Sequence, residues 1–407
     1  MNFPVEYFRG IDTPFYYYDV ELLERTIATV KAEAERYGNF DVHYAIKANF
    51  NPRLLKIMAD AGLGADCVSG GEIQASLDAG FPGDRIVYAG VGKSDWEIEL
   101  GLRAGIRYFN VESVAELEVI NEIAAEMDLM ACVSFRINPD VGAHTHANIT
   151  TGLAENKFGI AMDQMETVIR KAQEMTHTTF VGLHFHIGSQ ILEMDDFIAL
   201  AHRINKLQDR LEAQGIGPIQ HINVGGGLGI DYAQPNENPI PNFKAYFEAY
   251  EKYLKLRPGQ ELHFELGRAI VGQCGSLITK CLYVKQTEHK QFVIVDAGMT
   301  DLIRPALYNA KHCIENLVSK EETQTYDVVG PICESSDVFA YDCQLPATKR
   351  GDLLAIRSAG AYGQSKLEAE KGILAKRPQT SAFLCCVLLS FDLFIHKQPV
   401  VDNRMVE

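Results

Sequence analysis

Regular alternation between helix-forming segments and short apolar runs, from about residue 20 to residue 270, constrains the fold of this chain most. The segment ELLERTIATVKAEAERYG has helical periodicity, and the run VHYAIKAN after it is typical of a strand. Further strands are predicted over residues 64–68, 86–89, 108–111, 133–138, 182–187, 222–225 and 262–265. Because strict strand–helix alternation requires parallel strands, eight such units in about 250 residues predict a (β/α)8 barrel of the TIM type.

The pattern changes after Gly272, where short β-rich runs follow one another without long helices. The runs SLITKCLYVKQ, QFVIVDAG, YDVVG and DLLAIRSAG predict a mostly antiparallel β-domain, to which the early segment TPFYYYDV adds a strand. A length of 407 residues agrees with two domains. We therefore expect an α/β chain with a barrel over 31–271 and a β-domain formed by 1–30 and 272–407.

The composition argues against several classes of function. A formal net charge of −16 disfavours nucleic acid, which needs a basic surface, and an anionic membrane surface. The longest apolar run, residues 382–389, is far shorter than the roughly 20 residues that span a bilayer. Nine cysteines without CxxC spacing and a start without a secretory signal favour reduced thiols. We expect a cytoplasmic protein that binds neither nucleic acid nor membrane.

Chemically useful side chains fall at the predicted carboxyl ends of the strands, where the active sites of such barrels lie. Lys47 is costly to bury there as a cation, so its pKa should fall, which is the condition for a Schiff-base amine. The alternative is a surface lysine just beyond a strand end. The whole set comprises Lys47, Asp66, Arg136, His186, the glycines within 225–229, Glu265 and Arg268.

Three further features allow both a functional and a structural interpretation. The glycine run GGGLG at 225–229 lets backbone N–H groups converge on an anion such as phosphate, although a tight turn would use glycines equally. Glu265 can face a protonated pyridine nitrogen, as pyridoxal phosphate requires, or pair with Arg268. Cys333 can deliver a proton, whereas most cysteines are inert small hydrophobes.

Paired histidines raise the alternative of a metal-dependent hydrolase. His184 and His186 share one face of a strand, and His144 and His146 repeat their spacing. A metal site needs further His and Asp ligands at other strand ends, but those ends carry lysine, glycine and glutamate. His221 precedes its strand and so faces the other end of the barrel. We expect no metal, with His186 stacked on a flat cofactor and His184 in the core.

Ten short motifs occur in an order that resembles the fold-type III pyridoxal-phosphate-dependent decarboxylases, from about residue 10 to Gly363. They are YAIKAN (44–49), DCVSGGEI (66–73), RINPDVGAHTH (136–146), KFGI (157–160), HFHIGSQ (184–190), NVGGGLGI (223–230), ELGR (265–268), RPALY (304–308), CESSD (333–337) and GAYG (360–363). The resemblance is strongest to members that convert meso-2,6-diaminopimelate to L-lysine, the last step of lysine biosynthesis. Residues 364–407 are atypical for the family.

The resemblance implies a role for each matching residue. It makes Lys47 the Schiff-base lysine, stacks His186 on the cofactor ring and sets Glu265 against the pyridine nitrogen. It also implies that Cys333 is the proton donor, presented from the partner subunit of a homodimer whose active sites combine both chains. The implied cofactor-binding set is Lys47, Asp66, His186, Ser189, Gly225, Gly226, Gly227, Glu265, Gly267, Arg268 and Tyr362. The implied substrate-binding set is Arg268, Arg304, Tyr308, Glu334 and Tyr362.

The residues themselves favour a substrate with an amino-acid-like far end. A distal ammonium beside a distal carboxylate requires an acid paired with arginine, and Glu334 with Arg268 and Arg304 supplies that pair. The alternatives are a related decarboxylase for carboxynorspermidine or a basic amino acid, an amino-acid racemase, and a non-catalytic regulator that keeps the fold. A racemase would need a tyrosine base where CESSD stands, and an intact Lys47 and Cys333 argue against the regulator.

Overall fold

The computed structural model describes residues 3–142, 157–217, 219–363 and 400–402. The chain forms two compact units. The barrel unit comprises Arg25–Ile230 and Pro241–Ile270, and the sheet unit comprises Met1–Glu24, Asp231–Ile240 and Val271–Glu407. The segment Asp231–Ile240 lies inside the range expected for the barrel but clusters with the sheet unit. His144, His146 and most of the atypical segment after Gly363 lie outside the described residues.

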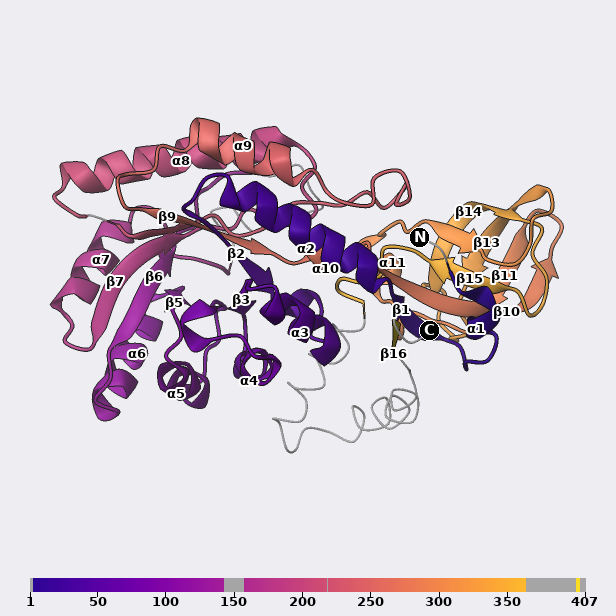
Figure 1. Ribbon diagram of the computed structural model, residues 1–407, viewed down its shortest axis with the longest axis horizontal. Helices are drawn as coiled ribbons and strands as arrows, with labels where there is room; N and C mark the ends of the chain where they lie inside the picture. Colours follow the sequence, from indigo (N-terminus) through magenta and orange to yellow (C-terminus); the bar gives the residue numbers. More distant parts are fainter. Residues whose placement is uncertain (1–2, 143–156, 218, 364–399, 403–407) are drawn as a thin grey trace. The chain divides into compact units, whose positions relative to one another are not determined.

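Eight parallel strands close into the predicted barrel, with each strand paired to the next and the last paired to the first (Figure 1). The strands are β2 (Phe40–Ala45), β3 (Gly64–Cys67), β4 (Ile86–Tyr88), β5 (Tyr108–Val111), β6 (Ala131–Arg136), β7 (Thr178–His184), β8 (His221–Asn223) and β9 (Glu261–Leu266). All eight overlap the predicted strands, so the prediction of the (β/α)8 barrel is confirmed.

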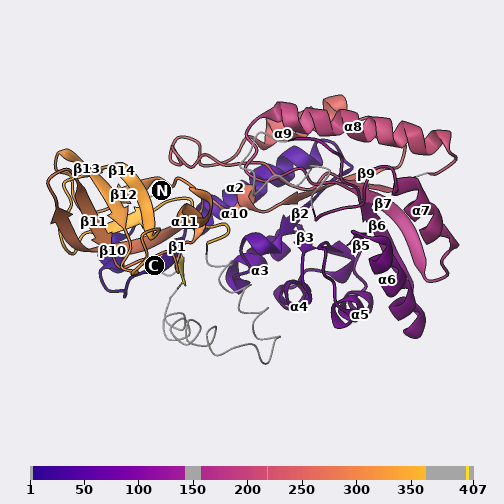
Figure 2. The ribbon, with the colours of Figure 1, turned by 180° about the vertical axis from the view of Figure 1, so that it is seen from behind.

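Helices cover the outside of the barrel: α3 to α6 follow one another along one side, and α8 and α9 pack together on another (Figures 1 and 2). The helices associated with the barrel are α2 (Val20–Glu35), α3 (Pro52–Asp60), α4 (Gly70–Ala79), α5 (Asp95–Ala104), α6 (Val114–Glu126), α7 (Met165–Glu174), α8 (Met194–Ala213), α9 (Phe243–Tyr253) and α10 (Arg268–Val271). The short 3-10 helices η1 (Ile46–Ala48) and η2 (Gly83–Arg85) follow β2 and precede β4.

Local sequence sets the starts of several of these helices. The side chains of Asn51, Ser69 and Ser113 accept hydrogen bonds from backbone N–H groups in the first turns of α3, α4 and α6. Ser94 and Glu97 form a reciprocal capping box at α5. Such caps satisfy N–H groups that have no partner within the helix. Each helix therefore begins at a defined distance after its strand, which keeps the strand-end loops short.

The sheet unit is built from one eight-stranded sheet with the path β12–β15–β10–β11–β13–β14. In addition, β1 pairs with β10, and β16 pairs with β1. Most pairings are antiparallel, while β11 with β13 and β1 with β16 are parallel. Its strands are β1 (Phe15–Tyr18), β10 (Gly275–Gln286), β11 (Gln291–Val295), β12 (Ile314–Asn316), β13 (Thr323–Val329), β14 (Val338–Pro346), β15 (Leu353–Ile356) and β16 (Val400–Asp402), and its helices are α1 (Val5–Phe8) and α11 (Arg304–Tyr308).

One core cluster of the sheet unit joins the start of the chain to later strands. Phe8 of α1 and the β1 residues Phe15 and Tyr17 pack with Ile278 and Leu353, and all five are buried. The pairing of β1 with β10 confirms that TPFYYYDV adds a strand to the β-domain.

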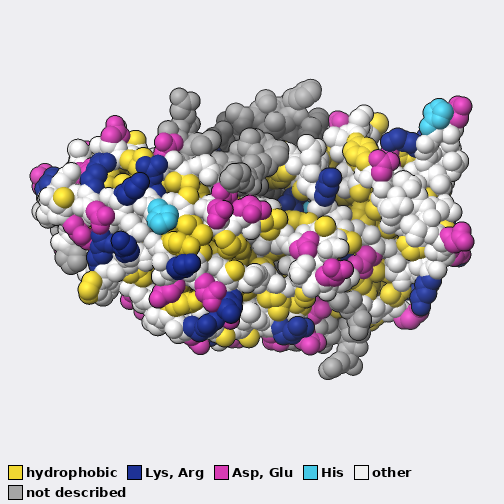
Figure 3. Space-filling view, turned by 90° about the horizontal axis from the view of Figure 1, so that it is seen from above, with side chains coloured by type: hydrophobic (Ala, Val, Ile, Leu, Met, Phe, Trp, Pro, Cys, Tyr) yellow, Lys and Arg dark blue, Asp and Glu magenta, His cyan; other side chains and the backbone are white. Residues whose placement is uncertain are grey.

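The surface is mixed in character. On the face shown in Figure 3, acidic and basic side chains are interspersed among neutral and apolar ones. Among the described residues, no helix is both long enough and apolar enough to cross a membrane.

Candidate active site

Lys47 and Asp66 meet at the carboxyl ends of neighbouring strands. Lys47 lies in η1, directly after β2, and its Nζ donates to Asp66 Oδ2 of β3 at 2.9 Å. Asp66 is fully buried, whereas the Lys47 side chain is 36% exposed. Burial, reinforced by the negative charge of Glu265 and opposed by Lys47, raises the pKa of Asp66 to about 6. The lysine amine is therefore held at the strand ends while remaining accessible.

Glu265 of β9 is held in the barrel interior by three side chains from other strands. His184 Nε2 lies 3.1 Å from one carboxylate oxygen, and the amides of Asn223 and Asn110 donate to the other at 2.8 and 3.3 Å. Burial would raise the pKa of Glu265, but its interactions with His184 and Lys47 hold that pKa well below its usual range. Glu265 is thus a buried, oriented anion. Because a carboxylate only accepts, the facing His184 nitrogen carries a hydrogen.

Sequence reasoning missed these supporting residues. His184 is buried, as expected for a core histidine, but it also contacts Glu265. Asn110 and Asn223 are fully buried polar residues in the otherwise apolar strand runs YFNV and HINV. A buried amide needs a hydrogen-bond partner. An asparagine within an apolar strand run was therefore the feature of the sequence that could have indicated a polar contact inside the barrel.

His186 follows β7 and faces the glycine run. The N–H of Gly226 donates to His186 Nδ1 at 3.3 Å, so that nitrogen carries a lone pair. Burial and the positive charges of Arg136 and Lys47 lower the pKa of His186 well below its usual value. The ring is therefore neutral, with its hydrogen on Nε2.

The glycines at 225–227 are required by their surroundings. Gly225 and Gly227 have φ angles of 68° and 105°, a region that side chains rarely adopt. A Cβ on Gly226 would lie only 2.0 Å from the carbonyl oxygen of Glu265. The loop after β8 therefore runs tightly against β9.

Arg268 and Ser189 form a second polar pair near this loop. Arg268 Nη2 donates to Ser189 Oγ at 2.8 Å, and Arg268 is buried. Gly267, just before it, has no room for a side chain, since an added Cβ would lie 2.9 Å from the Cβ of Ala48. A guanidinium and a hydroxyl beside this glycine loop are donors suited to a phosphate.

The other predicted site residues belong to the sheet unit. Arg304 and Tyr308 begin and end α11, and Arg304 is buried while Tyr308 is half-buried. Cys333 and Glu334 are exposed in the loop between β13 and β14. Tyr362 has a φ of 57°, an uncommon backbone conformation that often marks functional positions. The structure thus brings the predicted residues of the barrel together at the strand ends. The five remaining residues, Arg304, Tyr308, Cys333, Glu334 and Tyr362, lie in the sheet unit.

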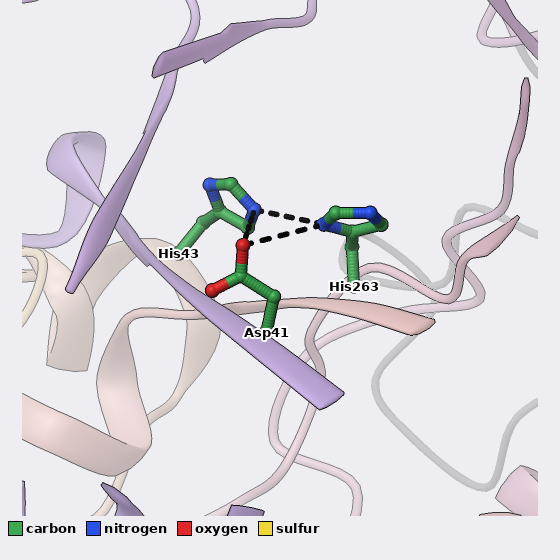
Figure 4. Close-up of side chains that lie close together, drawn as sticks. All are labelled: Asp41, His43 and His263. Atoms are coloured by element: carbon green, nitrogen blue, oxygen red, sulfur yellow. Dashed lines mark hydrogen bonds and ion pairs between the residues drawn. The ribbon is translucent and has the colours of Figure 1, made fainter. Parts of the chain in front are cut away.

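A separate polar cluster lies toward the amino-terminal end of the barrel strands (Figure 4). Asp41 and His43 come from β2, and His263 comes from β9. His43 Nε2 lies 3.0 Å from His263 Nδ1, and His263 Nε2 lies 2.9 Å from His221 Nδ1. The three imidazoles therefore form a hydrogen-bonded row, at the end of the barrel expected for His221.

This row is better explained as a structural network than as a metal centre, although ligand atoms of Asp41, His43 and His263 lie within 4.8 Å of one another. Arg85 binds both oxygens of Asp41, and Arg107 binds one of them and also Glu261. A divalent cation would be repelled by these two guanidinium groups. Burial lowers the pKa of His43 to about 3, so its ring is neutral, with Nε2 bonded to His263.

Comparison with known proteins agrees with this arrangement. Residues 23–272 match the family described as "Pyridoxal-dependent decarboxylase, pyridoxal binding domain". The chain is 64% identical over 362 residues to a diaminopimelate decarboxylase of Bacteroides thetaiotaomicron, covering 89% of this chain and 94% of the relative. It is 43% identical over 364 residues to a diaminopimelate decarboxylase of Helicobacter pylori, covering 88% of each chain.

Solved structures give the same result. The crystal structure of diaminopimelate decarboxylase from Helicobacter pylori complexed with L-lysine has a TM-score of 0.83 and 41% identity, covering 89% of each chain. The diaminopimelate decarboxylase of M. jannaschii has a TM-score of 0.82 and 37% identity, covering 89% of this chain and 85% of that one.

Fold and strand-end residues together define a pyridoxal-phosphate-dependent enzyme of the barrel class. The chain belongs to the pyridoxal-dependent decarboxylase family, in the group of proteins named diaminopimelate decarboxylase.

The barrel residues fit pyridoxal phosphate. Lys47 offers an accessible amine for the aldehyde, and Glu265 is an anion suited to a protonated ring nitrogen. The Arg268–Ser189 pair beside the glycine loop suits the phosphate. The buried oxygen Asp66 Oδ1 has no hydrogen-bond partner among the described residues, which is the condition of a site built to receive a further polar group.

Replacing Gly226 with alanine is expected to destabilise the protein by about 1–3 kcal/mol, because the added Cβ would force β9 and its loop apart. Thermal unfolding with and without pyridoxal phosphate measures the effect, and the variant should also gain less stability from the cofactor. Gly92→Ala is the control, since a Cβ there meets nothing within 4 Å. Equal unfolding temperatures for the two variants would contradict the tight loop.

Proposed function

We propose that this chain removes carbon dioxide from meso-2,6-diaminopimelate and yields L-lysine. The observation that carries the proposal is the 64% identity, over 89% of the chain, to a protein named diaminopimelate decarboxylase. The structural neighbour complexed with L-lysine supports it further, because L-lysine would be the product.

We assign cofactor binding to the strand-end residues of the barrel. Lys47 carries the cofactor, His186 packs on its ring, and Glu265 faces the ring nitrogen. The neutral imidazole of His186 and the ionised carboxylate of Glu265 support these roles, since a protonated ring nitrogen needs an anion opposite it. The full proposed set is Lys47, Asp66, His186, Ser189, Gly225, Gly226, Gly227, Glu265, Gly267, Arg268 and Tyr362.

Bound pyridoxal phosphate supplies the electron acceptor for the pair left behind when carbon dioxide departs. The chain's own residues do the remaining work. His184, Asn110 and Asn223 keep the Glu265 carboxylate ionised and fixed in direction. Cys333 delivers a proton from its thiol to the carbon that has lost carbon dioxide.

Recognition of the far end of the substrate is assigned to the second set of predicted residues. Glu334 pairs with the distal ammonium, while arginine binds the distal carboxylate through parallel N–H groups. Arg304 is suited to this because its guanidinium is already held within the sheet unit. The proposed set is Arg268, Arg304, Tyr308, Glu334 and Tyr362.

A substrate panel tests the proposed function. Carbon dioxide release should be far faster from meso-2,6-diaminopimelate than from L-lysine, L-ornithine or carboxynorspermidine. If carboxynorspermidine is preferred, the family assignment stands and the substrate is wrong. If no compound reacts while pyridoxal phosphate is bound, the chain is a regulator that keeps the fold.

Arg304→Ala is expected to lower kcat/KM for meso-2,6-diaminopimelate by at least roughly tenfold, because a buried carboxylate would lose a partner worth about 2–5 kcal/mol. The loss should be smaller for ornithine, which has no distal carboxylate. Arg350→Ala is a matched control, since both guanidinium groups lie over a tyrosine ring, at 4.7 and 4.8 Å. Equal losses for both substrates would make Arg304 structural.

We further propose a cytoplasmic homodimer in which Cys333 and Glu334 act in the partner's active site. The exposure of both residues supports this role for them. Seven described cysteines are free thiols, in keeping with a reducing compartment. Analytical ultracentrifugation tests the assembly, and a monomer at assay concentration would contradict it.

A further inference from the structure

His312, just after α11, contacts the guanidinium of Arg304 directly. His312 Nε2 lies 2.8 Å from Arg304 Nη1, and His312 Nδ1 lies 2.8 Å from the carbonyl oxygen of Arg357. Both His312 and Arg304 are buried, each with 6% of its surface exposed. The imidazole therefore bridges an arginine side chain and the backbone beside β15.

The two contacts determine where the imidazole hydrogen lies. A backbone carbonyl only accepts a hydrogen bond, so Nδ1 must donate to Arg357. A guanidinium only donates, so Nε2 must carry the lone pair. His312 is therefore neutral, in one tautomer, and accepts from Arg304.

The position of His312 is itself fixed by backbone pairing. The N–H of Arg357 donates to the carbonyl of Cys313 at 2.8 Å, which joins the two segments on either side of the imidazole contact. The N–H of Cys313 donates to the carbonyl of Tyr232 at 3.1 Å. The acceptor for Arg304 is thus anchored on two sides.

Tyr232 completes the enclosure of the guanidinium. Arg304 lies over its ring at 4.7 Å, and the same ring meets His312 edge-on at 4.9 Å. The guanidinium thus contacts the imidazole through Nη1 and lies over the phenol ring. A guanidinium carries its N–H groups in a rigid planar fork, so the bond from Nη1 to His312 fixes the direction of the whole fork.

We propose that His312 is a positioning residue, which together with Tyr232 fixes the Arg304 guanidinium for the distal carboxylate of the substrate. The proposal rests on the proposed function and specifies how the far end of the substrate is recognised. An arginine held in advance loses less side-chain freedom when the carboxylate binds, which strengthens binding without a new contact. The acceptor must be neutral, because a protonated imidazole would repel the guanidinium and offer it no lone pair.

The test uses two variants of the cofactor-loaded protein. His312→Phe keeps a flat ring of similar size but removes the acceptor. His312→Gln supplies an amide oxygen that can accept from Arg304 and an amide N–H that can donate to Arg357. Unchanged cofactor absorbance and thermal unfolding would show that both variants fold.

Two inhibitors that differ only in the distal carboxylate show how much that carboxylate contributes to binding. L-lysine, as the product, retains that carboxylate, whereas 1,5-diaminopentane is the same chain without it. In His312→Phe, the KM for meso-2,6-diaminopimelate and the inhibition constant of L-lysine should both rise about tenfold. kcat and the inhibition constant of 1,5-diaminopentane should change less than about threefold, and His312→Gln should restore most of the lost binding.

Three results would overturn the inference: equal weakening of both inhibitors, a fall in kcat alone, or no recovery in a folded His312→Gln. Failure of the proposed function is distinguishable from these. If the wild-type protein does not decarboxylate meso-2,6-diaminopimelate, the role of His312 is still decided by spectroscopic titration of L-lysine and 1,5-diaminopentane against wild type and both variants. Equal affinities for L-lysine in all three proteins would then refute it.

Discussion

Lys47→Ala should remove the visible absorbance of the bound cofactor and lower turnover by about 10³-fold or more, since losing a covalent catalytic group can cost up to about 10⁶ in kcat. The physical reason is that the Lys47 amine is held at the strand ends by Asp66, whose Oδ2 accepts from Lys47 Nζ at 2.9 Å. Absorbance spectra and single-turnover assays of the purified variant measure both effects.

Lys56→Ala is the control for the loss of a lysine from the barrel unit. Lys56 lies exposed on α3 and pairs with Asp60, one turn further along the same helix. It should keep both absorbance and turnover. A wild-type protein that gains no visible band with added pyridoxal phosphate would refute the assignment of Lys47.

Cys333→Ala should lower kcat by about 10²–10⁴-fold, the usual contribution of a positioned proton donor, while leaving the cofactor band unchanged. Cys343→Ala is the matched control, because Cys343 is a half-buried free thiol on β14 with a pKa raised to about 11 by burial. The two thiols of this region should therefore differ sharply in their effect on turnover.

Mixing inactive variants tests whether Cys333 acts across a subunit interface. Cys333→Ala mixed with Lys47→Ala should regain part of the activity, because a hybrid dimer would contain one site with both residues intact. Absence of recovery, after subunit exchange has been demonstrated with labelled chains, would mean that each site is built within one chain.

The barrel was predictable because its signal is repeated eight times along the sequence. Each strand is short and apolar and each helix is periodic, so neighbouring units reinforce one another. The strands β12 and β14 were missed for the opposite reason. The run IEN of β12 is short and mostly polar, and β14 alternates irregularly in burial. Sheet strands of that kind are specified by their partners rather than by their own composition.

The support around Glu265 could not be predicted because it depends on barrel closure. β9 pairs with β2 in a register that sets His43 beside Glu265, and the carboxylate then meets His184 and two asparagines from other strands. The hydrophobic pattern of a single strand does not show which inward-facing side chains of other strands lie at the same level of the closed barrel. The same limit applies to His312, whose contact with Arg304 spans a turn that the periodicity does not describe.

The division of the chain into interleaved units has a consequence for its synthesis. Barrel residues run almost without interruption from Arg25 to Ile270, so the barrel can close before the ribosome has made most of the sheet unit. β1 cannot pair with β10 until β10 has been synthesised, because Tyr16 pairs with Leu277. Contacts so distant in sequence form slowly, and the aromatic strand FYYY stays unpaired until then. The order of translation thus leaves the first strand of the chain unpaired while the whole barrel is made, and exposes it to chaperones or to aggregation in the interval.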